Sequence, residues 1–323
     1  MSGKSSTRWM PEGDLGHTAA NQQRLESRSA FLEAARAGEI MEAECLMCDC
    51  ATMQLRISLP GGIIGIMPKE EVCWQADGGE TKDIAVITRV GKPVQFRVLS
   101  VTENECGETV ARLSRRQVQQ ACADDYVSRL TCGDIIPARV THLEAFGAFC
   151  DIGCGIVSLL TVDRISVSRI THPSDRFRVG DRLSVLVSSI EENGRIYLSH
   201  RELLGTWAEN ASLFSAGQTV RGIVRSVESY GIFVELTPNL AGLAELTDGV
   251  QPGDACSVYI KSILPERMKV KLVLIDTCGK AETAPCRYWI DPAETKHLDR
   301  WLYSPVGARK TVESSFGALS VLP

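Results

Sequence analysis

Two four-residue motifs place pairs of aromatic side chains at the same spacing, Phe146-Gly-Ala-Phe149 and Tyr230-Gly-Ile-Phe233. Because side chains alternate between the two faces of a strand, a strand that begins at each glycine turns its last aromatic ring away from the apolar interior. Rings exposed in this way can stack on unpaired nucleic-acid bases, which is worth about 1–3 kcal/mol per base. The alternative is that a connecting helix or a neighbouring domain covers the rings, because exposed apolar patches mark interfaces of any kind.

The same alternation predicts which neighbours of these rings lie inside. They are small or apolar side chains at every second position: Ala148, Cys150 and Ile152 after the first glycine, and Ile232, Val234 and Leu236 after the second. Phe149 and Phe233 then point outward, and Phe146 and Tyr230, just before each bend, lie on the same side. Each motif therefore presents two rings on one outer face.

Basic residues accompany the aromatic motifs and could contact phosphates, which would position a nucleic-acid strand without reading its sequence. Between Arg164 and Arg178 there are four arginines and one acidic residue, a local excess of +3, and a histidine lies in the same loop. Arg195 and its counterpart Lys269 open the strand that we expect beside the aromatic face. The candidate RNA-binding residues of basic type are Arg164, Arg169, His172, Arg176, Arg178, Arg195 and Lys269. For the loop alone, the alternative is an ordinary solvated charge run.

These motifs belong to a repeated module. The segment from Gly133, GDIIPARVTHLEAFGAFCDI, matches the segment from Gly217, GQTVRGIVRSVESYGIFVEL, and a fainter copy, GEIMEAECLMCDCATMQLRI, begins at Gly38. Period-2 alternation between turn residues predicts antiparallel strands, with Gly147 and Gly231 at a bulge or sharp corner. Five short strands in about 70 residues are typical of a five-stranded barrel of the OB type.

The remaining pattern completes a mainly β chain of tandem five-stranded barrels joined by short helical connectors. Later strands are predicted at Leu183–Ile190, Arg195–Ser199, Ala255–Ile263 and Met268–Leu274. Helical spacing of apolar residues predicts helices over Asn21–Ala37, Arg116–Leu130 and Arg201–Phe214. The expected domains are an N-terminal tail and helix (1–37), a divergent repeat (38–116), two further repeats (133–202 and 217–275) and a C-terminal extension of unpredicted fold (276–323).

The second and third copies resemble the S1-type RNA-binding domain. Its pattern of spaced glycine and valine, an aromatic-Gly-x-Phe motif and a late Arg-Ile-x-Leu-Ser strand is present at Gly133–Val140, Phe146–Phe149 and Arg195–Ser199. The loop Arg169-Ile-Thr-His-Pro-Ser-Asp175, followed by Val179-Gly-Asp181, is more specific, because it is similar to a loop of the bacterial ribosomal protein S1 family. The resemblance covers roughly residues 38–275 and is strongest over 133–202. It implies OB-fold barrels that bind RNA.

The sequence departs from the family pattern at several positions. The histidine that follows the glycine-rich turn in the family is Ser158 in the second copy and Ala244 in the third. In the first copy Ala51 and Gln54 replace both aromatic residues. We therefore expect the first copy to dock on a protein rather than on RNA. Degenerate amino-terminal repeats of the ribosomal family attach to the small ribosomal subunit, so the resemblance implies ribosome docking here.

Composition excludes several classes of protein. The 323 residues are 44% hydrophobic and 23% charged, which excludes wholesale disorder, and no apolar run approaches the roughly 18–20 residues of a membrane span. The net charge of −5 argues against a strongly basic protein that coats duplexes, whereas single-strand binding needs only a local basic patch. The first 15 residues contain no apolar signal region, so we expect a cytoplasmic protein whose twelve cysteines are reduced and mostly buried.

Motifs for catalysis are absent from the sequence. No phosphate-binding G-x-x-x-x-G-K-(S/T), H-E-x-x-H or G-x-S-x-G occurs. Cys45-x-x-Cys48-x-Cys50 has a metal-like spacing, but no second pair of ligands follows nearby, which favours structural cysteines. His142 and His200 have no evident Cys or Asp partner. We therefore expect no enzyme activity, no metal and no cofactor.

These observations, with what the resemblance implies, predict a non-catalytic single-stranded RNA-binding protein of translation. The expected partners are messenger RNA and the small ribosomal subunit, with no membrane and no small-molecule substrate. With about three phosphates neutralised, the logarithm of affinity should fall with the logarithm of salt concentration at a slope near −2. The rival hypotheses are a protein-interaction module, a free RNA-binding regulator that does not reside on the ribosome, and a ribonuclease subunit or fused enzyme.

Overall fold

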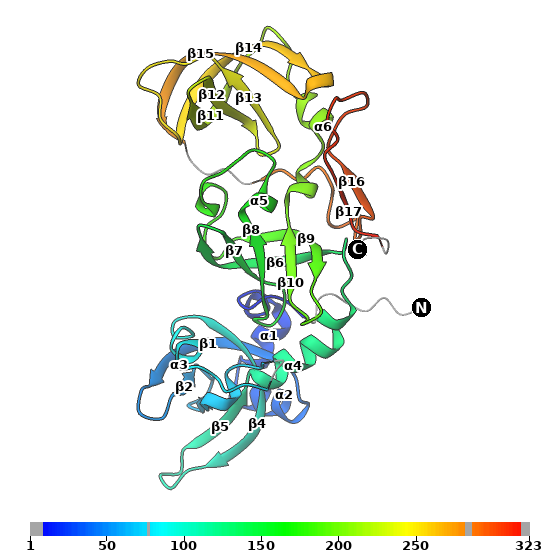
Figure 1. Ribbon diagram of the computed structural model, residues 1–323. Helices are drawn as coiled ribbons and strands as arrows, with labels where there is room; N and C mark the ends of the chain where they lie inside the picture. Colours follow the sequence, from blue (N-terminus) through cyan, green and yellow to red (C-terminus); the bar gives the residue numbers. More distant parts are fainter. Residues whose placement is uncertain (1–8, 76–77, 282–285, 318–323) are drawn as a thin grey trace. The chain divides into compact units, whose positions relative to one another are not determined.

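The computed structural model describes residues 9–75, 78–281 and 286–317 and divides into two units. Met1–Leu130 and Asp151–Val157 form the first unit, and Thr131–Cys150 and Ser158–Pro323 form the second. The strands make three closed five-stranded barrels, which confirms the mainly β fold of tandem barrels (Figure 1). The first eight residues of the expected N-terminal tail lie outside the described residues.

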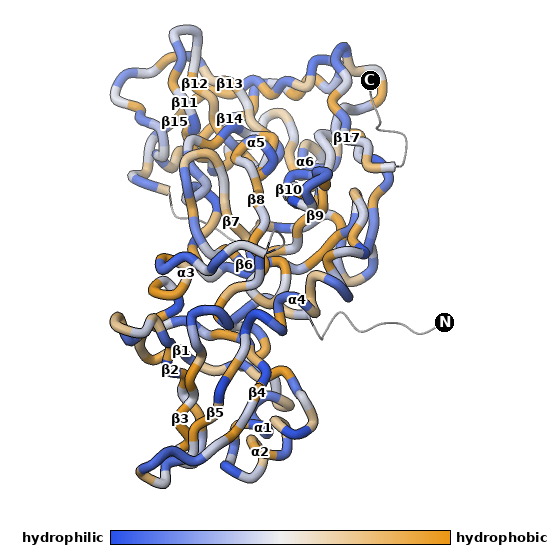
Figure 2. The backbone as a smooth tube through the Cα atoms, turned by 60° about the horizontal axis from the view of Figure 1, so that its bottom comes forward, coloured by the Kyte–Doolittle hydropathy of each residue, from blue (hydrophilic) through white to orange (hydrophobic). Residues whose placement is uncertain are grey.

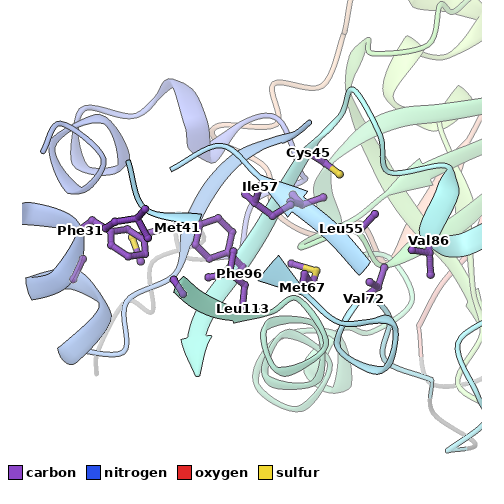
Figure 3. Packing of buried hydrophobic residues seen from close by; sticks show 14 residues of the cluster. Phe31, Met41, Cys45, Leu55, Ile57, Met67, Val72, Val86, Phe96 and Leu113 are labelled. Carbon is purple, nitrogen blue, oxygen red and sulfur yellow. The ribbon is translucent and has the colours of Figure 1, made fainter. Parts of the chain in front are cut away.

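Barrel 1 belongs to the first unit and has the strand order β1-β2-β3-β5-β4. Its strands are β1 (Met41–Asp49), β2 (Gln54–Ile57), β3 (Ile64–Met67), β4 (Pro93–Glu103) and β5 (Thr109–Ser114). The accompanying helices are η1 (Leu15–His17), α1 (Ala19–Arg24), α2 (Arg28–Arg36), η2 (Lys69–Glu71), α3 (Asp83–Ile87), α4 (Arg116–Asp125) and η3 (Val127–Arg129). Phe31 of α2 packs with Met41 and Phe96 of the barrel in one buried cluster (Figure 3). Truncating such a fully buried ring costs about 3–5 kcal/mol of stability.

The helix predicted over Asn21–Ala37 is divided into α1 and α2. The Ser27 hydroxyl accepts a hydrogen bond from the Ala30 N–H at 3.2 Å and so forms the N-cap of α2. A serine in this position satisfies an amide that would otherwise have no partner, and it competes with continuation of the preceding helix. The second helix ends before Gly38, whose φ of +67° suits a residue without a Cβ.

A buried ion pair attaches the N-terminal segment to the end of barrel 1. Arg115, directly after β5, donates from Nε to Glu12 Oε1 at 2.6 Å and from Nη2 to Oε2 at 2.8 Å. Both side chains are less than a tenth exposed, so they depend on protein partners for the interactions that water would otherwise supply, and Arg89 at 3.4 Å and the Gln95 amide at 3.1 Å also bind the Glu12 carboxylate. Loss of either partner from a buried pair costs about 3–5 kcal/mol.

Barrel 3 and all of barrel 2 except Asp151 and Val157 belong to the second unit, and both barrels repeat the same topology. Barrel 2 consists of β6 (Ile135–Glu144), β7 (Gly147–Asp151), β8 (Val157–Thr161), β9 (Arg182–Ile190) and β10 (Ile196–Ser199). Barrel 3 consists of β11 (Thr219–Glu228), β12 (Gly231–Thr237), β13 (Leu240–Ala244), β14 (Asp254–Leu264) and β15 (Lys269–Lys280). One parallel pairing occurs in each barrel, between β8 and β10 and between β13 and β15.

Alternation along β7 and β12 follows the predicted pattern almost throughout. Ala148, Cys150, Ile232 and Val234 are fully buried, as is Ile152 just beyond β7. Leu236 is the exception and is half-buried, because the pairing of β12 with β13 shifts register between Glu235 and Thr237. Glu235 precedes the shift and keeps its outward position, and it is buried because Arg176 and Arg225 bind its carboxylate.

The glycine that opens each of these strands is needed for a close approach of two chains. A Cβ on Gly231 would lie 2.6 Å from the Ala244 carbonyl oxygen, and one on Gly147 would lie 2.5 Å from that of Leu160. Gly231 also has a φ of +150°, which side chains rarely allow. Gly231 pairs with Glu228 at the corner of the β11–β12 hairpin, whereas the register shift lies further along β11, between Val224 and Ser226.

The C-terminal extension forms a hairpin and loops that pack on both barrels of the second unit. Its strands β16 (Arg300–Leu302) and β17 (Glu313–Ser315) pair antiparallel, and Figure 1 shows them in red near α6. Trp301 and Tyr303 belong to the buried cluster of barrel 3, whereas Phe316 packs with Ile135 of barrel 2. The unit's helices are α5 (Val162–Ile165), η4 (Pro173–Asp175), η5 (Arg201–Leu204), α6 (Trp207–Ala211) and η6 (Pro265–Arg267).

Two of the predicted connectors are likewise shorter than expected. The segment 116–130 contains α4 and η3, and the segment 201–214 contains η5 and α6. Gly205, with a φ of +85°, separates η5 from α6. Figure 2 shows polar and apolar residues interleaved along the chain, and none of the described helices is long and apolar enough to cross a membrane.

Candidate nucleic-acid interface

An aromatic ring and a lysine lie at the two ends of a row of paired residues on barrel 3. Phe233 of β12 pairs with Leu243 of β13, and Leu243 pairs with Lys271 of β15. Residues paired across neighbouring strands share a face of the sheet, so these three side chains lie side by side on the outside. Tyr230, 67% exposed, meets Phe233 edge-on with 6.1 Å between the ring centroids. The outer face thus carries two rings beside a cation.

These residues line a groove of about 740 Å³. Its charged lining residues are Glu245, Lys261, Arg267, Lys269, Lys271 and Lys310. Among the described residues none of the four lysines has an ion-pair partner. The Arg267 Nε lies 4.0 Å from Glu266 Oε1, at the limit of an ion pair. Five cations and one carboxylate around a concave surface focus a positive potential, which suits a chain of phosphates.

Barrel 2 carries the matching aromatic face. Phe146 is 55% exposed and meets Phe149 edge-on, with ring centroids 5.9 Å apart. The His142 ring also contacts Phe149, with the ring centroids 6.2 Å apart and the planes at 26°, and the His142 Nε2 lies 2.7 Å from Glu144 Oε1. His142 is exposed. The imidazole adds a third ring to this cluster on which a base could stack.

Tyr197 is a member of this face that the sequence analysis did not single out. It pairs with Leu159 of β8 in the same parallel register in which Lys271 pairs with Leu243 of β13. The two barrels therefore place a tyrosine and a lysine at equivalent positions. The signal was present in the sequence, because Tyr197 is two residues beyond Arg195 and strand alternation puts both on one face. Lys271 has the same relation to Lys269.

The predicted basic residues divide into exposed and buried ones. Arg169, Arg178, Arg195 and Lys269 are exposed, and Arg164 is half-exposed with its Nε 3.9 Å from Asp163. Of these, Lys269 lines the groove on barrel 3. The structure therefore brings one predicted cation to the Tyr230–Phe233 pair and adds Lys261, Arg267, Lys271 and Lys310, which the sequence analysis missed.

Arg176 has a structural place between the barrels of the second unit. Its buried guanidinium forms an ion pair with Glu235 of β12, and Arg225 of β11 binds the same carboxylate at 2.7 Å. Nearby in the loop, the Ser168 amide donates to the Pro238 carbonyl at 3.0 Å. The loop predicted to contact phosphates thus attaches barrel 2 to barrel 3, and we leave Arg176 out of the proposed interface.

Two histidines also have structural contacts. The His172 Nδ1 accepts a hydrogen bond from the Ser174 amide at 3.1 Å and so caps η4, which leaves its ring only partly exposed. His200 is fully buried, and burial lowers its pKa to about 4. Its Nδ1 lies 3.1 Å from the Ile165 carbonyl and its Nε2 3.2 Å from the Tyr288 hydroxyl, which fits a neutral ring that donates at one nitrogen and accepts at the other.

Barrel 1 replaces the aromatic face with a basic one. The β1–β2 hairpin of barrel 1 and the β11–β12 hairpin of barrel 3 each contain one register shift. The residue pair next to the shift, on the side of the turn, contains Arg56 of β2 in the first hairpin and Phe233 of β12 in the second, so these two residues are equivalent. The expectation that Ala51 and Gln54 hold the aromatic positions is wrong, because the β1–β2 turn is two residues longer than the β11–β12 turn. A comparison of repeats by eye cannot place such an insertion.

The row on barrel 1 continues with a second arginine. Arg56 pairs with Ile66 of β3, and Ile66 pairs with Arg112 of β5. Arg112 forms an exposed ion pair with Glu70 at 2.9 Å. The three positions that Phe233, Leu243 and Lys271 hold in barrel 3 are therefore held by Arg56, Ile66 and Arg112 in barrel 1.

Among the described residues, the cysteine thiols and the other potential metal ligands do not form a cluster. Cys45 is buried, Cys48 is half-buried and Cys50 is exposed, and all three are free. Within the part of the chain that the structure describes, no group of three His, Cys, Asp or Glu side chains is placed to hold a metal ion. Burial raises the pKa of Cys45 to about 11, which keeps this thiol protonated at neutral pH.

Comparison with protein families assigns part of this architecture. Residues 129–201 match the family model of the S1 RNA binding domain. The matched range contains all five strands of barrel 2, so the chain contains an S1 RNA-binding domain there.

Curated relatives extend the similarity over more of the chain. The small ribosomal subunit protein bS1 of Leuconostoc lactis is 32% identical over 177 residues, which cover 50% of this chain and 41% of that protein. The bS1 protein of Chlamydia muridarum is 26% identical over 230 residues, which cover 67% and 39%. The chain therefore spans about two fifths of the length of these relatives. A solved multidomain protein with nucleic acid binding domains from Streptococcus pneumoniae matches with 14% identity over 74% of each chain and a TM-score of 0.25, a likeness too low to carry an argument.

Proposed function

We propose that barrels 2 and 3 bind single-stranded RNA by stacking bases on the rings of their outer faces, of which Phe146 and Tyr230 are exposed and Phe149 and Phe233 half-buried, and by pairing phosphates with the cations beside them. The groove on barrel 3 carries the proposal, because Tyr230 and Phe233 share its lining with five cations. Bases of a single strand can leave their neighbours and stack on a side chain, whereas bases of a duplex are already stacked and paired. The S1 RNA-binding domain at residues 129–201 supports the same ligand for barrel 2.

The geometry suggests how a strand would lie on barrel 3. Successive bases would stack on Tyr230 and Phe233, and the backbone would pass across Leu243 towards Lys271 and Lys269, which are two residues apart on β15. Every base has a flat face, and lysines contact phosphates without reading bases, so sequence preference would be slight. On barrel 2 the corresponding surface is Phe146 and Phe149 with His142 and Tyr197, and Arg195 supplies charge.

We further propose that the bound strand is messenger RNA and that the protein acts in translation without cleaving its ligand. The similarity to bS1 proteins over half or more of the chain supports this setting. Attachment to the small ribosomal subunit would fall to barrel 1. Its outer row has Arg56 and Arg112 in place of rings, which suits contacts with phosphate or carboxylate groups on the subunit's surface rather than base stacking.

Fluorescence anisotropy with a short labelled oligouridine tests the proposal. The double variant Phe149→Ala/Phe233→Ala should weaken binding by about 2 kcal/mol or more, which is roughly 30-fold. Tyr259→Ala is the matched control, because Tyr259 is an exposed ring on β14 of barrel 3 that does not line the groove. Equal affinity of wild type and double variant would refute the stacking proposal. Loss of a protein from pull-downs at unchanged RNA affinity would favour the protein-interaction alternative.

The setting in translation needs separate measurements. Co-sedimentation with ribosomes should decrease in the variant Arg56→Gln/Arg112→Gln, while its affinity for oligouridine stays within about twofold of wild type, since this row stacks no base. Unchanged co-sedimentation would remove barrel 1 from the proposal. Incubation of labelled RNA with the protein and Mg²⁺ should leave the RNA intact, and cleavage would support the ribonuclease alternative.

A further inference from the structure

The C-terminal extension reaches the groove that the aromatic face of barrel 3 forms. Tyr303, Lys310 and Val312 of the extension line this groove together with Phe233 and Lys271 of the barrel. These three residues come after β15 (Lys269–Lys280), the last strand of barrel 3. A segment from outside the repeat therefore forms one wall of the groove.

Several hydrogen bonds hold this wall in place. The Tyr303 hydroxyl donates to the Asn239 carbonyl at 2.6 Å, in the turn between β12 and β13. The Arg309 amide donates to the Glu266 carbonyl at 2.9 Å, in the turn between β14 and β15. These two hydrogen bonds attach the extension to two turns of barrel 3, one at Tyr303 and one at Arg309. The second bond holds the residue directly before Lys310.

The loop is also closed by its own contacts. The Ser304 hydroxyl donates to the Lys310 carbonyl at 2.8 Å and accepts from the Val312 amide at 2.8 Å, and the Tyr303 amide donates to the Val312 carbonyl at 2.9 Å. These bonds fix the backbone at Lys310 while its side chain stays exposed. Its ammonium group is without an ion-pair partner among the described residues. A fixed backbone lowers the entropy that the lysine loses when it binds an anion.

We infer that the C-terminal extension is an RNA-binding element, in which Lys310 contacts a phosphate of the strand that occupies the groove of barrel 3. This inference rests on the proposed function of that groove. The ligand chemistry is a phosphodiester of single-stranded RNA, because the same groove offers rings for the neighbouring bases. The extension thus makes the RNA-binding track of barrel 3 about one nucleotide longer than the barrel alone could provide.

The salt dependence of binding measures this contact directly. Each phosphate neutralised on a single strand contributes about −0.7 to the slope of log affinity against log salt. The full-length variant Lys310→Gln should therefore have a slope smaller in magnitude by about 0.7, and an affinity about fivefold lower at 0.1 M salt, with no difference near 1 M. Lys310→Arg keeps the charge and should behave as wild type.

Arg309→Gln is the matched control, since it removes the same charge from the neighbouring residue, which is exposed but does not line the groove. Its slope should equal that of wild type. A Lys310→Gln slope equal to wild type, or equal losses in both variants, would refute the inference. The variant Phe233→Ala distinguishes a failure of this inference from a failure of the proposed function of the groove. If Phe233→Ala weakens binding while Lys310→Gln does not, only the role of the extension fails. If Phe233→Ala leaves binding unchanged, the proposed function fails first.

Discussion

The place of Arg176 between two barrels gives a prediction that separates its structural role from contact with RNA. In Arg176→Met the methionine keeps part of the buried stem, while the Glu235 carboxylate loses one of its two guanidinium partners. A hydrogen bond to a charged group is worth about 1.5–3 kcal/mol. Because Arg225 still binds Glu235, the loss should stay below the ~3–5 kcal/mol of a buried charge left alone. We therefore expect the second unit to lose about 2 kcal/mol of stability.

Two measurements on the same variant check this reasoning. Urea unfolding and amide hydrogen exchange should show weaker protection in β12 and in η4, since these elements meet through the lost ion pair. RNA binding, measured where the variant is folded, should keep the wild-type salt slope. Arg178→Met is the control for loss of charge, because Arg178 is exposed in the same loop. A slope smaller by about 0.7 with unchanged exchange would show that Arg176 binds phosphate and would refute its structural role.

The lysines of the groove on barrel 3, Tyr197 of barrel 2 and the buried His200 each give a further expected outcome. Lys269→Gln/Lys271→Gln should reduce the magnitude of the salt slope by about 1.4, and a slope within error of wild type would remove β15 from the phosphate track. Tyr197→Ala should weaken oligouridine binding by about 1 kcal/mol or more, measured by anisotropy, while Tyr197→Phe keeps the ring and the affinity. His200 stays neutral in the fold with a pKa of about 4, whereas an unfolded histidine titrates near 6.5, so the unfolded state binds more protons as pH falls below about 6.5. The His200 contribution should therefore cost the second unit ~2 kcal/mol between pH 7 and pH 5, measured in urea unfolding as the difference in pH dependence between wild type and His200→Asn.

The barrels could be predicted because their signal is local. A period-2 pattern fixes which side chains face the interior, and it correctly placed Ala148, Cys150, Ile232 and Val234. The prediction that Leu236 is buried failed, because alternation assumes regular pairing along the whole strand. At Leu236 the pairing of β12 with β13 shifts register. The same limit explains the error in barrel 1, in which a longer turn moved Arg56 to the position that the comparison of repeats gave to Gln54.

The candidate site could be predicted only in part, because its cations come from separate segments. Tyr230, Phe233 and Lys269 were found through the repeat, whereas Arg267 comes from a turn and Lys310 from the extension. No periodicity connects residue 310 with residue 233, since their proximity depends on how the extension packs. The role of Arg176 was hidden for the same reason: a run of arginines has the same composition whether its members bind phosphate or a buried carboxylate.

The side chains on the outer faces of the three barrels differ, although the barrels share one strand topology. The rows on barrels 3 and 1 cross three strands through a central aliphatic residue, Leu243 or Ile66, and in barrel 2 Leu159 pairs with Tyr197 in the equivalent parallel register. The residues that pair with this aliphatic residue differ between barrels: Tyr197 in barrel 2, a ring and Lys271 in barrel 3, and Arg56 with Arg112 in barrel 1. These positions point away from the interior, so their substitution costs the fold little, whereas inward positions are constrained by close packing. The series from rings to cations shifts the favoured contact from base faces to phosphate or carboxylate groups. This difference is the physical basis for our proposal that barrels 2 and 3 bind RNA and that barrel 1 attaches to the ribosomal subunit.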